Sequence, residues 1–392
     1  MRVWLDNTGV QSAALCLSGQ GRSESDIKSL LQLATLIAFS DSLLVNGFEV
    51  PEVARRTAEI SHNLAALGLD ESAFCIQAET EDSFAAACAE AADGAAEDLP
   101  YVFRPAEPTA GDVLPPLLSP AMRATQAAFP DALAAEPSGQ VLRELRVEAL
   151  GRKSAGAVQI MLAESAELRR AVREVRSAFS PFSESCAEQL SGALRCFLNE
   201  TLAARHSASY VPAVARAELV RRESTAAIAA VERALGQVVE DLTPKPLSVP
   251  PIASYLIQKA RGDPKGIIQE AIALREKTAD VRAWLGRRLR SSERDYSKYV
   301  HELLSSTEAL RDLVRRELRL DKRALLTDGI ELQLVLGVPT ASLSASVLRT
   351  WVKSRVSHGR IAILTDVSKV AAYPADPFAL QKLRSKCLEA AS

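Results

Sequence analysis

The fold is decided by the first 46 residues, which read MRVWLDNTGV QSAALCLSGQ GRSESDIKSL LQLATLIAFS DSLLVN. Val3-Trp4-Leu5 is a short apolar run, and Ser23 and Asp26 have the spacing of an N-terminal helix cap. The helix that they open carries apolar residues at helical spacing from Ile27 to Ala38, and a second apolar run, Ser42–Asn46, follows it. This stretch therefore predicts a strand, a helix and a strand in succession.

The same alternation continues to about residue 104. Pro51 is expected to open the next helix and Gly68 to end it. A third strand is expected over 73–76, a third helix over 81–92 and a fourth strand over 101–103. Because single helices separate these strands, the strands are expected to pair in parallel. We predict an N-terminal α/β domain with a parallel sheet over residues 1–104.

The remainder of the chain divides into three further units. Five prolines lie between Pro105 and Pro120, which predicts a proline-rich strap or linker over 105–139. Helical spacing then dominates residues 140–323, a large helical domain, in which the four prolines of 243–251 predict a loop. Residues 324–392 contain two strand-like runs, at 330–336 and 361–364, and a helix after Pro377, so they predict a small α/β unit. The fold class is mixed and mainly α.

Composition excludes several classes of protein. Hydrophobic residues make up 47% of the chain and charged residues 24%, which is typical of a folded globular protein. The longest apolar stretch, Leu30–Phe39, is too short to span a membrane, so no membrane partner is expected. The six cysteines are scattered without a CxxC pair, which favours reduced thiols and a cytoplasmic location. The sequence contains no HExxH, GxGxxG or GxxxxGK[ST] motif.

Charge is divided unevenly along the chain. Residues 1–150 hold 9 Lys and Arg against 22 Asp and Glu, a net charge of −13. Residues 151–392 hold 38 Lys and Arg against 27 Asp and Glu, a net charge of +11. Such a division predicts either that the acidic and basic parts associate, within one chain, between two copies or with a protein partner, or that the basic part binds a polyanion such as nucleic acid.

Three carboxylates follow successive predicted strands and form the candidate catalytic and metal site. Asp6 follows the first strand, Glu52 lies after the second and Asp82 after the third. Because the carboxyl ends of parallel strands meet at one edge, these side chains are expected to bind Mg²⁺ or Mn²⁺ there. The alternative is structural: Asp6 caps a helix, and Glu52 and Asp82 stabilise helix starts through the helix dipole.

Residues 1–104 resemble a PIN-like nuclease domain. Val3-Trp4-Leu5-Asp6-Asn7-Thr8 is similar to the opening strand of that family, and Glu52 falls where a second acidic ligand is expected. Asp82-Ser83-Phe84-Ala85-Ala86-Ala87 resembles the third acidic motif, an Asp that opens an alanine-rich helix. The resemblance implies metal-dependent cleavage of nucleic acid with Asp6, Glu52 and Asp82 as ligands, as in a bacterial toxin or defence effector.

A row of arginines in the helical part supplies a second functional signal. Arg311, Arg315, Arg319 and Arg323 recur every four residues and are expected to form a ridge that contacts successive phosphates of nucleic acid. Alternatively, acidic residues at 308, 312, 317 and 321 pair with this row on a solvated surface. Two functions remain open: a metal-dependent nuclease, or a non-catalytic helical interaction or regulatory module in a protein complex.

Overall fold

The computed structural model spans residues 1–392 and describes part of that chain. The described residues are 1–47, 51–80, 83–84, 86–87, 196, 198–217, 220–221, 245–288, 296–319, 328–334, 361–366 and 376–388.

The described strands form one sheet, in the order β3-β2-β1-β4-β7-β6-β5. Its strands are β1 (Arg2–Leu5), β2 (Ser42–Asn46), β3 (Phe74–Gln77), β4 (Ser209–Val211), β5 (Lys245–Val249), β6 (Asp328–Leu334) and β7 (Ile361–Asp366). Five neighbouring strands, from β3 to β7, are parallel, and β6 and β5 extend the sheet with antiparallel pairing. The predicted parallel pairing of the first three strands is confirmed.

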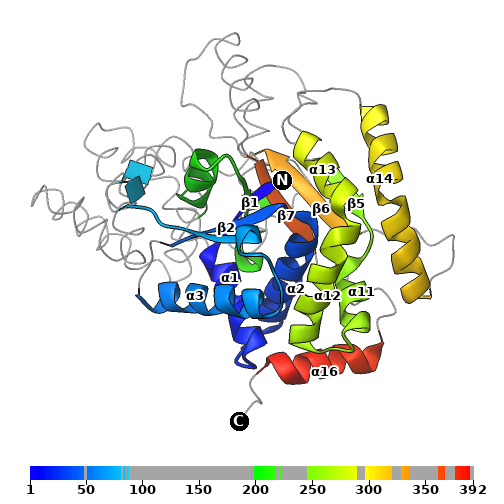
Figure 1. Ribbon diagram of the computed structural model, residues 1–392, viewed down its shortest axis with the longest axis horizontal. Helices are drawn as coiled ribbons and strands as arrows, with labels where there is room; N and C mark the ends of the chain where they lie inside the picture. Colours follow the sequence, from blue (N-terminus) through cyan, green and yellow to red (C-terminus); the bar gives the residue numbers. More distant parts are fainter. Residues whose placement is uncertain are drawn as a thin grey trace, which may run out of the picture.

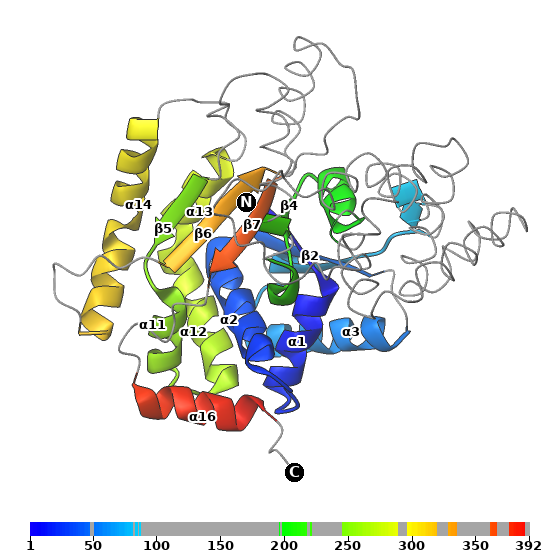
Figure 2. The same ribbon diagram turned by 180° about the vertical axis from the view of Figure 1, so that it is seen from behind.

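Helices pack against this sheet, and the described part of the chain is mainly helical, as predicted. They are α1 (Asn7–Leu17), α2 (Glu24–Phe39), α3 (Pro51–Ala66), α11 (Ile252–Lys259), α12 (Pro264–Lys277), α13 (Ala279–Arg288), α14 (Tyr296–Glu317) and α16 (Pro377–Cys387), with a 3₁₀ turn at Glu71–Ala73. Figures 1 and 2 show α1, α2, α11 and α12 side by side on one face of the sheet. Helix α16 crosses their far ends, and α14 lies on the outer side of α13.

The local signals at the helix ends are confirmed. Asp26 Oδ2 accepts hydrogen bonds from the backbone N–H of Ser23 at 3.0 Å and of Arg22 at 2.8 Å, so a capping box opens α2. Gly68 follows α3 with a φ of +98°, a left-handed conformation that glycine adopts without steric strain.

At β1 both faces of the sheet are covered, since alternate residues of a strand point to opposite sides and Val3, Trp4 and Leu5 are all buried. Val3 and Leu5 belong to a large apolar cluster that also includes buried residues of α1, α2, α3, α11, α12, α13, α14 and α16. Trp4 lies between them in sequence and faces the other side. There its Nε1–H donates to Asn199 Oδ1 at 3.0 Å, so the helical segment 198–205 covers that face.

Two strands lie where the sequence predicted other structure. β4 falls inside the predicted helical domain, and a strand of three residues is too short to show a period of two. β5 occupies the segment predicted to be a loop because of its prolines. The end of the strand order is at β5, and Pro246 is tolerated there because an edge strand has one side without ladder hydrogen bonds.

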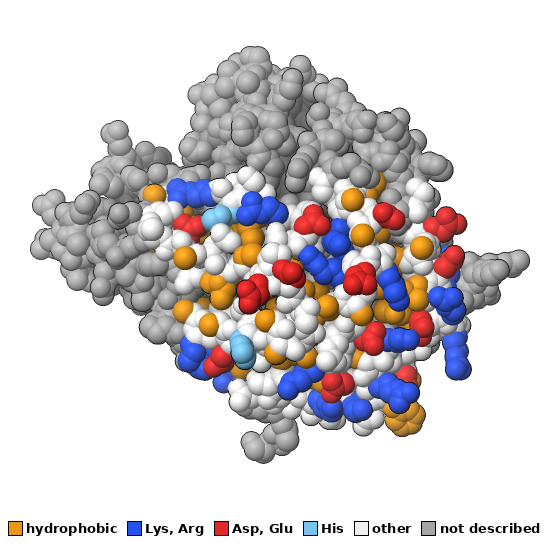
Figure 3. All heavy atoms as spheres, in the orientation of Figure 1, with side chains coloured by type: hydrophobic (Ala, Val, Ile, Leu, Met, Phe, Trp, Pro, Cys, Tyr) orange, Lys and Arg blue, Asp and Glu red, His pale blue; other side chains and the backbone are white. Residues whose placement is uncertain are grey.

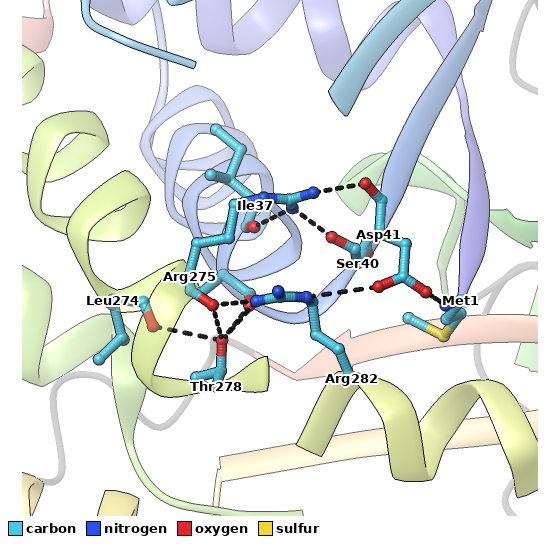
Figure 4. Close-up of polar contacts among 9 residues, drawn as sticks. Met1, Ile37, Ser40, Asp41, Leu274, Arg275, Thr278 and Arg282 are labelled. Atoms are coloured by element: carbon cyan, nitrogen blue, oxygen red, sulfur yellow. Dashed lines mark hydrogen bonds and ion pairs between the residues drawn. The ribbon is translucent and has the colours of Figure 1, made fainter. Parts of the chain in front are cut away.

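A polar junction joins the end of α2 to the turn between α12 and α13. The guanidinium of Arg275 donates to the carbonyl oxygens of Ile37, Ser40 and Asp41, and Arg282 forms an ion pair with Asp41 (Figure 4). The hydroxyl of Thr278, which is buried, lies 2.5 Å from the carbonyl oxygen of Ala38. Carbonyl groups at a helix end lack partners within the helix, so these side chains from the basic part of the sequence complete α2.

The predicted domain boundaries at residues 104, 139 and 323 lie outside the described residues and stay predictions. The predicted strand at 101–103 and most of the predicted helix at 81–92 lie there as well. Of the helices in the described ranges, none combines the length and the apolar character that crossing a lipid bilayer requires.

Candidate functional site

Asp6 lies buried at the carboxyl end of β1, with an exposed fraction of 3%. Since β1 lies between β2 and β4, Asp6 occupies the edge at which three parallel strands end. Its Oδ1 accepts a hydrogen bond from the backbone N–H of Thr8 at 2.9 Å, which makes Asp6 the N-cap of α1. The predicted structural role of Asp6, as a helix cap, is confirmed.

The other oxygen of Asp6 binds two groups that lie far away in the sequence. Oδ2 accepts hydrogen bonds from the hydroxyl of Tyr210 at 3.1 Å and from Nη1 of Arg216 at 2.5 Å. The Arg216 side chain is 13% exposed, so this ion pair is largely withdrawn from water. Burial by itself disfavours a charged guanidinium, but the Asp6 carboxylate outweighs it, and the pKa of Arg216 is raised above its ordinary value.

A second buried carboxylate lies near the same tyrosine. Glu200 belongs to the helical segment 198–205 and is 4% exposed. Burial raises the pKa of Tyr210 well above its ordinary value; the charges of Asp6 and Glu200 act in the same direction, and Arg216 opposes them. The Tyr210 hydroxyl therefore binds the Asp6 carboxylate, which also binds the guanidinium of Arg216, and the charge of a second buried carboxylate, Glu200, acts on the same tyrosine.

Asn7 joins the ends of two neighbouring strands. Its Nδ2 donates to the carbonyl oxygen of Asn46, the last residue of β2, at 2.8 Å. Its Oδ1 is buried and has no hydrogen-bond partner. Such unpaired buried oxygens are uncommon, and an amide oxygen is a donor of the type that hard divalent cations prefer.

A second polar cluster ties the segment after β3 to the segment before β4. Glu79 Oε1 lies 2.5 Å from His206 Nε2, and Glu79 Oε2 accepts a hydrogen bond from the Ser83 hydroxyl at 2.6 Å. Burial alone raises the pKa of Glu79, but Ser83 and His206 stabilise the carboxylate and lower it overall. The His206 ring stacks on Trp4 with a centroid separation of 5.1 Å.

Of the three predicted metal ligands, only Asp6 has a side chain among the described residues. Glu52 lies in the first turn of α3, with its side chain outside them, and Asp82 lies outside them entirely. Where side chains are described, no group of three or more His, Cys, Asp or Glu residues is placed to hold a metal ion. A site formed by Asp6, Glu52 and Asp82 stays a prediction.

The residue pattern did not single out Tyr210 or Arg216 as partners of Asp6, or Glu200 as a charge acting on Tyr210. All three lie in the stretch predicted to be a helical domain, at least 190 positions from Asp6. The one local signal is the apolar run at Tyr210-Val211, which ends at Pro212. That signal indicates a short strand, but it does not place the strand beside β1.

The predicted row of arginines is divided by the end of α14. Arg311 and Arg315 lie one turn apart on the helix and are half-buried. Arg319 is exposed and lies beyond the helix end with a φ of +53°, so it does not continue the helical row. Arg323 lies outside the described residues. Whether this row contacts nucleic acid stays a prediction.

The comparisons with known proteins gave no relative for this chain: no family model, no curated protein and no solved structure showed a significant match.

Proposed function

We propose that this protein cleaves nucleic acid in a metal-dependent reaction centred on Asp6 at the carboxyl end of β1. The observation that carries the proposal is the presence of two buried carboxylates, Asp6 and Glu200, near Tyr210 at the end of a central parallel strand. Ligands of open sheets with parallel strands bind at this edge. Charged groups in such surroundings occur more often at functional sites than elsewhere in proteins.

The strand order supports the resemblance to PIN-like nuclease domains. β1 and β2 are adjacent and parallel, and the Asn7 side chain bonds to the end of β2. Glu52 lies in the first turn of α3, the helix that follows β2, so its backbone begins near the edge that carries Asp6. Asp82 follows β3, the next strand of the same parallel set. The three carboxylates predicted from the sequence thus follow three neighbouring strands.

The donor atoms of this edge suit Mg²⁺ or Mn²⁺, which prefer oxygen ligands. Asp6, Glu200 and the unpaired Oδ1 of Asn7 would hold the ion, with Glu52 and Asp82 as further proposed ligands. The ion, when bound, supplies an activated water for attack on a phosphodiester. Arg216 balances the charge of Asp6, and it would give up its bond to Asp6 Oδ2 when the ion is held.

The proposed setting is the bacterial cytoplasm, in which a toxin or defence effector meets RNA and DNA. Cys16 and Cys387 are buried and form no disulfide bond, which suits a reducing compartment.

One observation favours the second candidate, a non-catalytic interaction or regulatory module. Both oxygens of Asp6 already accept hydrogen bonds, from Thr8, Tyr210 and Arg216. A carboxylate with that set of partners serves as a structural centre that holds α1, β4 and the segment after β4 together. Under this alternative the chain binds a protein partner and cleaves nothing.

A cleavage assay separates the two candidates. The full-length protein is incubated with end-labelled single-stranded RNA or DNA and with Mg²⁺, Mn²⁺ or EDTA. We expect metal-dependent cleavage by the parent protein and a fall to the EDTA background in Asp6→Asn and Glu200→Gln. Glu59→Gln is the matched control: it changes an exposed carboxylate of α3 that pairs with Arg55, and it is expected to retain the parent rate.

Thermal unfolding of each variant distinguishes lost chemistry from lost folding, and Mn²⁺ binding measured by electron paramagnetic resonance gives a second readout. The proposal requires folded parent protein to bind Mn²⁺ more tightly than folded Glu200→Gln. Equal cleavage by the parent and both variants would overturn it. Absence of metal-dependent cleavage by folded parent protein on every substrate would do the same, and the non-catalytic module would stand.

A further inference from the structure

Helix α14 has a clear inner face, and two arginines lie at its border. Thr307, Leu310 and Val314 recur at helical spacing and are buried, and Leu318 continues the series just after the helix end. Arg311 and Arg315 each follow one of these buried residues. Their side chains are half-buried, so the two guanidinium groups are partly withdrawn from water.

These two arginines lack the acidic partners that the sequence offers them. Glu308 and Asp312 are exposed, and neither forms an ion pair with Arg311 or Arg315. Glu317 is engaged elsewhere, because its Oε1 pairs with Lys259 Nζ at 3.3 Å. Within the described part of the chain, the self-paired surface predicted as the alternative for this row is therefore not formed at these two positions.

The arrangement leaves charge and hydrogen-bonding capacity unmatched. Nε of Arg315 is buried without a hydrogen-bond partner. Burial lowers the pKa of Arg311, and the neighbouring charge of Arg315 lowers it further. Two like charges held one turn apart and partly dehydrated are unfavourable unless an anion lies between them.

We propose that Arg311 and Arg315 form a binding site for a phosphate group. A guanidinium presents a planar fork of N–H donors that matches two phosphate oxygens, and two such forks on one helix face surround a tetrahedral oxyanion. The phosphate belongs either to a nucleic-acid backbone or to a small phosphate compound. Only the nucleic-acid source rests on the proposed function, because phosphate binding on α14 does not require chemistry at Asp6.

The test compares two double variants that remove the same charge. Arg311→Gln/Arg315→Gln removes the proposed site, and Lys265→Gln/Arg316→Gln is the matched control, because Lys265 and Arg316 are exposed and lie outside the predicted row. Binding of pyrophosphate and of a single-stranded oligonucleotide to the full chain is measured by titration calorimetry in EDTA, which prevents cleavage. An oligonucleotide with an uncharged methylphosphonate backbone serves as the blank.

Bonds between charged groups of this kind change affinity by about tenfold or more. We therefore expect at least about a tenfold loss of affinity for one or both phosphate probes in Arg311→Gln/Arg315→Gln, and less than about a twofold loss in the control. A loss confined to pyrophosphate identifies a small phosphate compound as the source, and a loss for the oligonucleotide identifies the nucleic-acid backbone. Equal losses in the two double variants, or no binding of either probe by the parent protein, would overturn the proposal. Each of these results is independent of whether Asp6→Asn abolishes cleavage.

Discussion

Replacing Arg216 by Met tests how strongly the core depends on the ion pair at the end of β1. Methionine keeps an unbranched side chain but removes the charge that neutralises Asp6. In the parent protein Nη1 of Arg216 lies 2.5 Å from Asp6 Oδ2. In Arg216→Met the buried carboxylate retains its hydrogen bonds from Thr8 and Tyr210.

The expected loss follows from the burial of both partners. Asp6 is 3% exposed and Arg216 is 13% exposed, so water cannot readily replace the lost charge. Removing one partner of a buried ion pair costs about 3–5 kcal/mol in free energy of unfolding. Because Asp6 keeps its hydrogen bonds from Thr8 and Tyr210, we expect a value at the lower end, about 3 kcal/mol. In Asp6→Asn/Arg216→Met, which removes both charges, the loss is expected to be smaller than the sum of the single losses by about 0.5–3 kcal/mol.

Urea unfolding at neutral pH, followed through the fluorescence of the buried Trp4 and Trp284, measures these losses. Arg55→Met is the matched control, since Arg55 forms an exposed pair with Glu59 one turn along α3. It is expected to cost about 0.5 kcal/mol or less. The reasoning is refuted if Arg216→Met costs no more than Arg55→Met, or if the Asp6 and Arg216 losses simply add.

Three further predictions concern the fold. Burial alone raises the pKa of Asp26, but hydrogen bonds lower it overall. The stabilisation by Asp26 is therefore present above the unfolded-state pKa of about 3.9 and is lost as the pH falls through the lower folded-state pKa. Asp26→Ala should accordingly cost about 1 kcal/mol in urea unfolding at about pH 7 and much less near pH 3. Gly68→Ala should cost about 1 kcal/mol because of its positive φ. Gly262→Ala should cost more, because a Cβ at that position would lie 2.0 Å from the carbonyl oxygen of Ala379. Equal shifts of the urea midpoint in the two variants would contradict this prediction. Thr278→Val leaves the buried carbonyl oxygen of Ala38 in α2 without its hydroxyl donor. The expected loss in free energy of unfolding is about 1–2 kcal/mol in the same assay. An unchanged urea midpoint would show that this hydrogen bond contributes nothing to stability.

Sequence patterns predicted the elements whose signals are local. Ser23 and Asp26 lie three residues apart, and a capping box needs nothing more distant. The strand ending at Leu5 and the helix beginning at Pro51 were likewise marked by apolar runs and by proline. β4 carried only the two-residue apolar run Tyr210-Val211, because three residues cannot display alternation. Pro246 was a misleading mark, because its exclusion from strands holds for central strands and not for an edge.

The residues of the candidate site likewise include some with a local sequence signal and some without one. Asp6 was predicted as a residue of the candidate site because a carboxylate directly after an apolar strand is a local feature of the sequence. Arg216 was not predicted as its partner, since the pairing depends on β4 lying beside β1, and the long sequence between these two strands does not specify that neighbour. The prediction that Arg311 and Arg315 of α14 contact phosphate groups came from their spacing alone. Their lack of acidic partners depends on side-chain conformation, which spacing does not determine.

In the structure, ion pairs connect the acidic first part of the sequence to its basic remainder. Four acid–base contacts between described residues join the first part of the chain to the remainder: Asp6–Arg216, Glu79–His206, Asp41–Arg282 and Glu24–Arg384. In each of them the acid comes from residues 1–150 and the base from residues 151–392. Figure 3 shows acidic and basic side chains interspersed over the described part of one face, as expected where opposite charges meet within one chain.

Apolar burial, rather than these charges, is expected to hold the two parts together. The charge division alone predicts association that weakens as salt shortens the Debye length to about 8 Å at physiological ionic strength. However, β1 pairs directly with β4, and one apolar cluster includes Leu36 of α2, Trp284 of α13 and Leu383 of α16. Salt does not weaken burial of this kind. A protease site inserted within residues 105–120 and then cut should therefore leave two fragments that co-elute from a sizing column in dilute buffer and in about 1 M salt, and that separate only in urea. Separation in high salt alone would mean that the charges dominate and that the shared sheet and apolar cluster contribute little to the contact.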